Sequence, residues 1–269
     1  VSALGGAVTG LNNVAIGQTA MDAMVGGSNN IALGLNAMTA STDGVNNIAI
    51  GANTMAASVN DGDMNIGIGA GAFQDGDISG NCNIALGVDA LRNVSTGANN
   101  IGIGANAGNA FAAANCSISI GLNSHLTGAG GAYNIAIGVN AVSAGGGGDN
   151  NNIAIGYLAM EDLAGGICNI AIGKSAGANA TTSCLNTYIG ESAGGVGVTT
   201  GKFSVYIGPG AGAAVTGQLG SIAIGQSAMA AATTGSYNNA IGRGALGGGT
   251  LTGTCNTGMG DGVMNSVAG

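Results

Sequence analysis

A short apolar pattern recurs along the whole chain. Its usual form is Asn-Ile-Ala-Ile-Gly, in which two large apolar residues flank a small one. This alternation over three residues has the period of a β-strand, and isoleucine favours strands. A helix would show an apolar stripe about every 3.6 residues, and frequent glycine would destabilise it. Each copy of the pattern therefore predicts one short strand.

The copies are almost evenly spaced. Fifteen of them close on a glycine, and successive closing glycines are 17 or 18 residues apart. These are Gly17, Gly34, Gly51, Gly69, Gly87, Gly104, Gly121, Gly138, Gly156, Gly173, Gly190, Gly208, Gly225, Gly242 and Gly260. One strand cannot bury its apolar face alone, whereas stacked coils can. We predict an all-β fold, a single parallel β-solenoid of about 15 coils of 17–18 residues, with residues 1–269 as one repeat domain.

Each column of the repeat predicts a place in the coil. The residue before the closing glycine is Ile in twelve copies, and we expect the isoleucines to face inward and the Ala or Gly between them to form a flat outer face. The fourth residue after the glycine is often Met, which suits an irregular core. The methionines are Met21, Met38, Met55, Met160, Met229 and Met264. Glycine is expected at the coil corners, where it supplies a positive φ.

Four residues before the closing glycine stands Asn in twelve copies and Ser in three. An Asn amide has donors and an acceptor, so equivalent Asn residues in adjacent coils can form a hydrogen-bonded ladder along the stack. The predicted ladder contains Asn13, Asn30, Asn47, Asn65, Asn83, Asn100, Asn134, Asn152, Asn169, Asn186, Asn238 and Asn256. Such a ladder would fix the register between coils.

The composition excludes several protein classes. Glycine fills 56 positions, and there are only 16 charged residues, no Trp, one Pro and three Phe. Collagen is excluded because the glycines have no three-residue period. The apolar fraction of 46% argues against disorder. The net charge of −8, with four scattered basic residues, argues against nucleic-acid binding, and the absence of a long apolar run argues against membrane insertion.

Residues 30–37 read Asn-Ile-Ala-Leu-Gly-Leu-Asn-Ala. This motif resembles the head repeat of YadA-like trimeric autotransporter adhesins, Asn-Ser-Val-Ala-Ile-Gly-x-x-Ser, and similar repeats occur in phage and viral fibre proteins. The resemblance covers the whole chain through short, low-complexity motifs. It implies a left-handed parallel β-roll that is extracellular, often trimeric, and used for adhesion.

Candidate chemistry is sparse. His125 is the only histidine, and a resemblance to hexapeptide-repeat acyltransferases raises a catalytic role for it. It occupies the methionine column, however, so we expect packing and no enzyme or cofactor. Asp61 and Asp63 in one loop, with Asp75 and Asp77 in the next, could hold Ca²⁺. Solvated turns are the favoured interpretation of these four aspartates.

The cysteines share one edge of the predicted stack. Cys168 and Cys184 lie in adjacent coils, so we predict a disulfide between them if the protein is secreted. Cys82, Cys116 and Cys255 lie in separate coils and are either free or paired with another subunit. Asn93, Asn115 and Asn179 match the N-glycosylation sequon, at a frequency that chance explains.

The chain ends also resemble the repeat, at residues 2–5 and 265–269. Ends without caps favour head-to-tail stacking into a filament. We therefore expect a structural subunit of an extracellular filament or fibre, which polymerises with itself and performs no catalysis. A shaft or head segment of an adhesin or viral tail fibre, binding a host surface or glycans, is the alternative. An ice-binding solenoid is a third interpretation, which the lack of ordered Thr arrays disfavours.

Overall fold

The computed structural model describes residues 3–6, 8–56, 62–76, 78–126, 131–144, 148–197, 199–232, 234–249 and 251–264. The chain is all-β: fifteen parallel strands of three residues each stack as a β-solenoid, and the described residues contain no helix. The predicted fold class is confirmed. Contacts divide the chain into two compact units, Val1–Tyr133 and Asn134–Gly269, which we describe separately. Whether residues 1–269 act as one domain stays a prediction, as does the left-handed coil.

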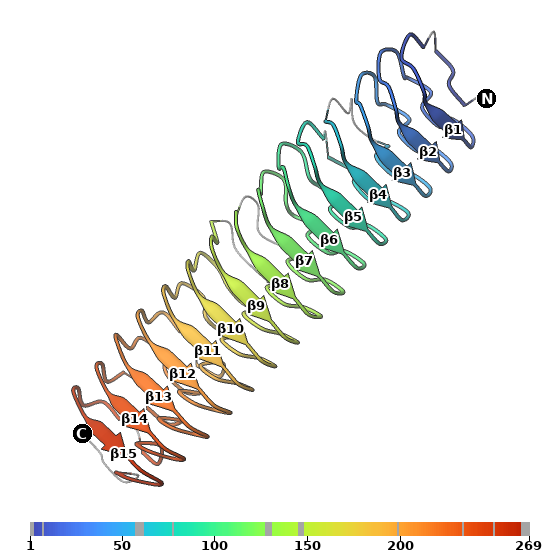
Figure 1. Cartoon of the computed structure of the whole chain (residues 1–269). Coiled ribbons are helices and arrows are strands. Elements are labelled where there is room, and N and C mark those ends of the chain that lie inside the picture. The colour runs from blue at the N-terminus through green and yellow to red at the C-terminus, as the bar shows by residue number, and fades with distance from the viewer. Residues whose placement is uncertain are drawn as a thin grey trace. The chain divides into compact units, whose positions relative to one another are not determined.

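The first unit contains seven strands, each paired with the next in chain order (Figure 1). They are β1 (Val14–Ile16), β2 (Ile31–Leu33), β3 (Ile48–Ile50), β4 (Ile66–Ile68), β5 (Ile84–Leu86), β6 (Ile101–Ile103) and β7 (Ile118–Ile120). Equivalent residues of adjacent coils pair without any shift, so that Ala15 lies beside Ala32 and Ala32 beside Ala49. Every repeat column is therefore a physical row of side chains.

The second unit contains eight strands with the same unshifted pairing. They are β8 (Ile135–Ile137), β9 (Ile153–Ile155), β10 (Ile170–Ile172), β11 (Thr187–Ile189), β12 (Val205–Ile207), β13 (Ile222–Ile224), β14 (Asn239–Ile241) and β15 (Thr257–Met259). This unit also has a second row of single-residue parallel bridges, which runs from Asn150 through Ile167, Cys184 and Lys202 to Leu219.

The prediction of which strand face is buried was wrong. The middle residue of the strand points inward: Ala32, Ala49 and Ala154 are fully buried. The first and third residues point outward, as in β2, where Ile31 and Leu33 are 38% and 39% exposed. The alternation of large and small residues is present, but the small residue faces inward and the large ones face outward.

The limited space inside the coil explains why the small residue, and not the isoleucines, faces inward. The third and fourth residues after the closing glycine, such as Ala37 and Met38, also point inward and are fully buried. They fill the space opposite the strand, which leaves room for only a methyl group or a hydrogen at most middle positions. The methionine column also contains Leu, Val, Phe, His and Gly. From Met21 to Leu246, its residues other than Gly are at most 2% exposed. Met264, in the last described coil, is 37% exposed.

The closing glycines have φ values between +123° and +141°, as expected for corners. Gly34 shows a second reason for glycine: an added Cβ would lie 2.4 Å from the carbonyl oxygen of Gly51 in the next coil. Other corners are occupied by residues other than glycine. The positions five before, two after and four after the closing glycine have φ between 47° and 62° in most coils, as in Asn29, Asn36 and Met38. The sequence pattern did not predict these left-handed positions.

Candidate interaction surface

The outward side chains of the strands form rows of mostly apolar residues that are partly or well exposed in each unit. We call the first and third residues of every strand the isoleucine face. In the first unit all fourteen members are Ile, Leu or Val. Exposed fractions reach 45% at Val14, 60% at Ile16 and 41% at Ile68. Monomeric proteins rarely expose contiguous apolar patches larger than a few hundred Å².

The isoleucine face carries no charged residue in either unit. In the second unit three of its first-residue positions are polar, namely Thr187, Asn239 and Thr257. Its third-residue positions are Ile in every strand except β15, where Met259 is 67% exposed. Both units therefore present a neutral surface in which the same side chains repeat at the spacing of adjacent strands, about 4.8 Å.

The asparagine ladder lies inside the coil, next to the first strand residue. From Asn13 to Asn238, the Oδ1 atom of each ladder Asn accepts the backbone N–H of the equivalent residue in the next coil, for example Asn83 from Asn100 at 2.9 Å. Its Nδ2 group donates to a backbone carbonyl, as Asn83 does to Gly97 at 2.8 Å. Most of these side chains are at most 2% exposed. Each amide therefore satisfies buried backbone groups and sets the register of the stack.

Serine continues the ladder with fewer bonds. Ser204 Oγ accepts the N–H of Ser221 at 3.3 Å, and Ser221 Oγ accepts the N–H of Asn238 at 3.2 Å. These distances are longer than those of the Asn rungs, and a hydroxyl is too short to replace the Nδ2 contact. The ladder is thus densest in the first unit, where only Ser117 interrupts the Asn residues.

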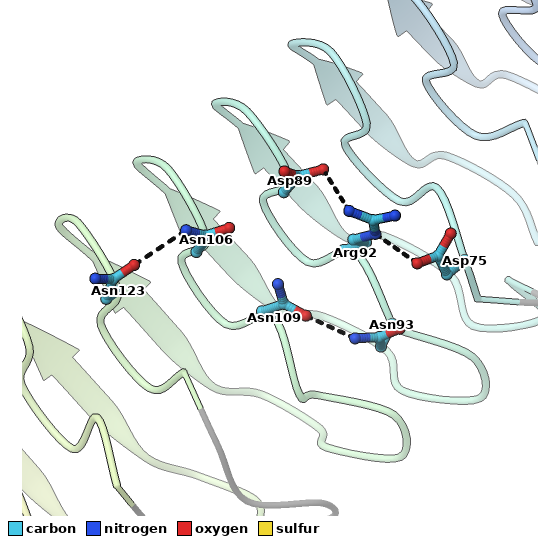
Figure 2. A network of polar contacts seen from close by, with 7 residues as sticks. All are labelled: Asp75, Asp89, Arg92, Asn93, Asn106, Asn109 and Asn123. Atoms are coloured by element: carbon cyan, nitrogen blue, oxygen red, sulfur yellow. Dashed lines mark hydrogen bonds and ion pairs between the residues drawn. The ribbon is translucent and has the colours of Figure 1, made fainter.

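A surface network joins coils of the first unit (Figure 2). Arg92 donates to Asp75 in the preceding coil and to Asp89 in its own, and this pairing raises the pKa of the guanidinium. Two amide pairs run beside it: Asn93 Nδ2 to Asn109 Oδ1 at 2.6 Å and Asn106 Nδ2 to Asn123 Oδ1 at 3.0 Å.

The second unit has two simpler ion pairs between adjacent coils. Lys174 binds Glu191 at 2.9 Å, and Arg243 binds Asp261 at 2.7 Å. In each pair the residues occupy equivalent repeat positions. The guanidinium of Arg243 lowers the pKa of the Asp261 carboxyl. Charges of opposite sign thus lie next to each other on adjacent coils at the surface.

His125 is a core residue. It is 1% exposed and meets the ring of Phe111 edge-on, with ring centres 4.6 Å apart. Burial lowers its pKa to about 4. Nearby repeat positions are also polar: Ser119 Oγ donates to the Ser124 carbonyl at 2.7 Å. In this structure the imidazole does not face solvent, where a substrate would reach it.

Asp149 is a buried carboxylate that the sequence pattern did not single out. It stands seven residues before a closing glycine, where most coils have Gly, and it is 1% exposed. Its Oδ1 accepts the N–H of Gly165, whereas its Oδ2 has no hydrogen-bond partner among the described residues. Burial raises its pKa to about 6. The signal in the sequence is a polar residue at a repeat position where most coils have Gly.

The candidate Ca²⁺ ligands have other partners. Asp63 Oδ1 accepts the N–H of Val45 at 2.8 Å, and Asp75 binds Arg92. Asp61 and Asp77 lie outside the described residues. Within the described part of the chain, no group of three or more His, Cys, Asp or Glu side chains could hold a metal ion.

All five cysteines are described, and all are free thiols. The expected Cys168–Cys184 bond is therefore not formed in this structure. Parallel pairing places Cys184 beside Ile167, so the two cysteines are one residue out of register. Formation of the bond under oxidising conditions stays a prediction.

The sequon asparagines bond to neighbouring coils or to their own. Asn93 donates to Asn109, and Asn179 donates to the Gly195 carbonyl at 2.8 Å. Asn115 accepts the N–H of Ala98 at 2.9 Å. Their glycosylation stays a prediction.

The chain was compared with models of known protein families, and none matches it. A search of curated proteins likewise finds no significant match. Over the described residues there is no helix long and apolar enough to cross a membrane.

Proposed function

We propose that the chain is a structural subunit of an extracellular fibre and that it associates side by side with copies of itself. The observation that carries this proposal is the isoleucine face. Of its fourteen members in the first unit, five are 38–60% exposed and the other nine are partly exposed. A standard interface buries about 800 Å² per partner.

The repeat spacing of the face favours a second copy as its partner. Apolar side chains that recur from coil to coil fit best against a surface with the same spacing. A second copy of this chain has that spacing, because it has the same repeat. Both surfaces would be uncharged, so no ionic group loses its solvent on contact. The fibre role itself also agrees with the resemblance of the repeat to adhesin heads and viral fibres.

Head-to-tail stacking stays a prediction from the repeat. Residues 1–2 and 265–269 lie outside the described residues, so the side-by-side contact is the part that can be argued from geometry.

The test is the molar mass in solution, measured by light scattering after size exclusion. The wild-type chain is expected to elute as an oligomer. Ile48→Thr, Ile66→Thr and Ile84→Thr together should shift it toward one chain, because they remove partly exposed apolar groups from one row of the isoleucine face. Thr is compatible with the strand, as Thr187 and Thr257 occupy the same position in β11 and β15.

The matched control removes three apolar side chains just after closing glycines, outside the strands. Leu35, Val88 and Leu122 are 46%, 53% and 47% exposed, and changing each to Thr should leave the molar mass unchanged. A wild-type chain that stays monomeric at high concentration would contradict the proposal. So would equal effects of the two triple variants, with both still folded by circular dichroism.

The adhesin alternative has one observation in its favour. Aromatic side chains are exposed in one repeat column, five before the closing glycine: Tyr133, Phe203 and Tyr237 are 59%, 60% and 55% exposed. Exposed aromatic residues are typical of binding surfaces. Binding on a glycan array that is lost when all three become Ser would favour this second function.

A further inference from the structure

A further outward row lies beside the isoleucine face of the second unit. It consists of the residues five before each closing glycine, two positions before the first strand residue. Leu185, Phe203 and Tyr237 in this row are 51%, 60% and 55% exposed. The ladder residue that separates the row from the strand is buried, as at Ser204, so the row continues the isoleucine face on the outside of the coil. We call it the edge row: Asn151, Cys168, Leu185, Phe203, Gly220, Tyr237 and Cys255.

The three exposed apolar residues of the edge row have an unfavourable backbone conformation. Their φ values are +60° at Leu185, +61° at Phe203 and +58° at Tyr237. This left-handed region suits Gly and Asn, whereas larger side chains are uncommon in it. Because more than half of each residue is exposed, packing within the chain compensates little for that conformation. The same row of the first unit has Asn in four coils, at Asn12, Asn29, Asn46 and Asn99.

Backbone hydrogen bonds hold the edge row in place. The N–H of Phe203 donates to the Cys184 carbonyl at 3.2 Å, and that of Tyr237 donates to the Leu219 carbonyl at 2.8 Å. Both acceptors belong to the row of single-residue bridges in this unit. The Tyr237 ring extends over the preceding coil, since a Cβ on Gly220 would lie 3.0 Å from the Cδ1 atom of the ring. Groups that are held in position before contact lose less conformational freedom on binding.

The size and charge of the combined surface favour a second copy of the chain as its partner. A standard interface has about 20–30 residues on each side. The isoleucine face of the second unit supplies sixteen residues, and the seven residues of the edge row bring the number into that range. The edge row contains no charged residue, so an apolar partner can cover it without removing water from an ionic group.

We propose that the edge row of the second unit anchors the contact between two copies, with Leu185, Phe203 and Tyr237 packed against the isoleucine face of the neighbouring copy. This assignment rests on the proposed side-by-side association and adds a position along the chain, because the second unit then contributes more to the contact than the first. In the first unit the exposed apolar residues of the same row, Met64 and Tyr133, are four coils apart. In the second unit three lie within four consecutive coils.

The test is a dilution series followed by light scattering, which gives the dissociation constant of the assembly. Leu185→Asn, Phe203→Asn and Tyr237→Asn together should raise this constant by about tenfold or more, because aromatic residues dominate the binding energy of many interfaces. Asn is compatible with the backbone here, as Asn151 occupies the same row with a φ of +57°.

The matched control changes three exposed apolar residues of the second unit that lie outside both surfaces. Val139, Tyr157 and Val196 are 39%, 49% and 67% exposed, and changing each to Asn should leave the dissociation constant unchanged.

The melting temperature of the triple edge-row variant, measured in dilute solution where the chains are single, gives an independent readout. It should equal or exceed that of the wild type, because Asn suits the left-handed backbone better than Leu, Phe or Tyr. A lower melting temperature would mean that these side chains serve the fold of the single chain, and would overturn the assignment.

Failure of the proposed function and failure of the edge-row assignment give different results. A wild-type chain that is monomeric at every concentration would overturn both. An assembly that survives the edge-row substitutions but dissociates with Ile48→Thr, Ile66→Thr and Ile84→Thr would overturn the edge-row assignment alone. So would an unchanged dissociation constant with loss of binding on a glycan array, which would assign the edge row to glycans.

Discussion

The two units build the same coil but fill it differently. In the first unit the middle strand residue is Ala, Gly or Ser, and the methionine column supplies the volume, as in Ala32 with Met38. In the coils of β11 and β12 the volume comes from the strand, at Tyr188 and Tyr206, and the methionine column is Gly. These coils therefore take their bulk from one side or the other, whereas the coil of β6 has Gly at both positions, Gly102 and Gly108, and the Phe111 ring packs there instead.

The glycines of the second unit show how tight this exchange is. A Cβ on Gly212 would lie 2.8 Å from the ring of Tyr206, and one on Gly194 would lie 2.4 Å from the ring of Tyr188. These glycines occupy left-handed positions at which the first unit tolerates Met. Their absence of a side chain is therefore explained by the tyrosine rings rather than by backbone conformation.

The largest change in the free energy of unfolding is expected when the bulky side chain is moved from the strand to the methionine column. Tyr206→Ala should cost about 3–5 kcal/mol by leaving a cavity, and Gly212→Met about 1–3 kcal/mol by overpacking. The double variant recreates the first-unit pattern, so it should cost less than the sum of the two. Urea unfolding of all four proteins measures the coupling. Strict additivity would refute the shared-volume account.

The next effect concerns the pH dependence of stability, because each unit buries one described group whose pKa is shifted to a value between about 4 and 6. His125 in the first unit has a pKa lowered from 6.5 to about 4. Its contribution to stability is present above pH 6.5 and is lost as the pH falls through 4. Asp149 in the second unit has a pKa raised from 3.8 to about 6. Its contribution is present below pH 3.8 and is lost as the pH rises through 6.

Each shift corresponds to about 3 kcal/mol, with opposite signs over the same range. The free energy of unfolding should then vary little between pH 4 and 7 in the wild-type chain. It should rise with pH in Asp149→Asn and fall with pH in His125→Met. Chemical denaturation at four pH values measures these slopes. Single variants that keep the wild-type profile would show that neither group titrates as its burial implies.

A smaller difference in stability is expected between an Asn side chain of the ladder, as in the first unit, and a Ser side chain, as in the second. Asn65→Ala leaves the N–H of Asn83 and the Gly80 carbonyl without their partners, and it should cost about 1–3 kcal/mol. Asn65→Ser keeps an acceptor for the N–H, as Ser204 does, and should cost less. Thermal melts compare the two. Equal losses would indicate that the Nδ2 contact is the only one that matters.

The smallest effect is expected at the exposed ion pairs. Arg243→Gln should leave the melting temperature unchanged, because Arg243 and Asp261 are both well exposed and surface pairs contribute little. Arg92→Gln in the first unit should produce a small, salt-sensitive decrease, because Arg92 is less exposed and binds two carboxylates. Melts at low and high salt distinguish them. An Arg243 effect as large as that of Arg92 would contradict this ranking.

Periodicity alone predicted the strands, their parallel order and the number of coils, because each depends only on the repeat. It could not predict which strand face is buried, since Ile31 and Ala32 alternate equally well with either side inward. That choice depends on how much space Ala37 and Met38 already occupy. The left-handed corners at Asn and Met were also missed, because backbone conformation there is imposed by the coil rather than by residue type.

The polar interior was predicted only in part. The Asn ladder follows from a residue type repeated in every coil. Asp149, Ser183 and Gln218 occur once each, so no period reveals them; they stand out only as departures from a glycine column. The isoleucine face was missed because the sequence assigned those residues to the core. Its exposure is the observation on which the proposed assembly rests.

The central claim is that the isoleucine face is a contact between copies of the chain. The most direct measurement is an electron cryomicroscopy reconstruction of the assembled protein, at a resolution that places side chains. The account predicts that β-strands of neighbouring copies face one another and that residues such as Ile50 and Ile68 are buried between them. A reconstruction in which copies meet through other surfaces, with these isoleucines still in solvent, would contradict it.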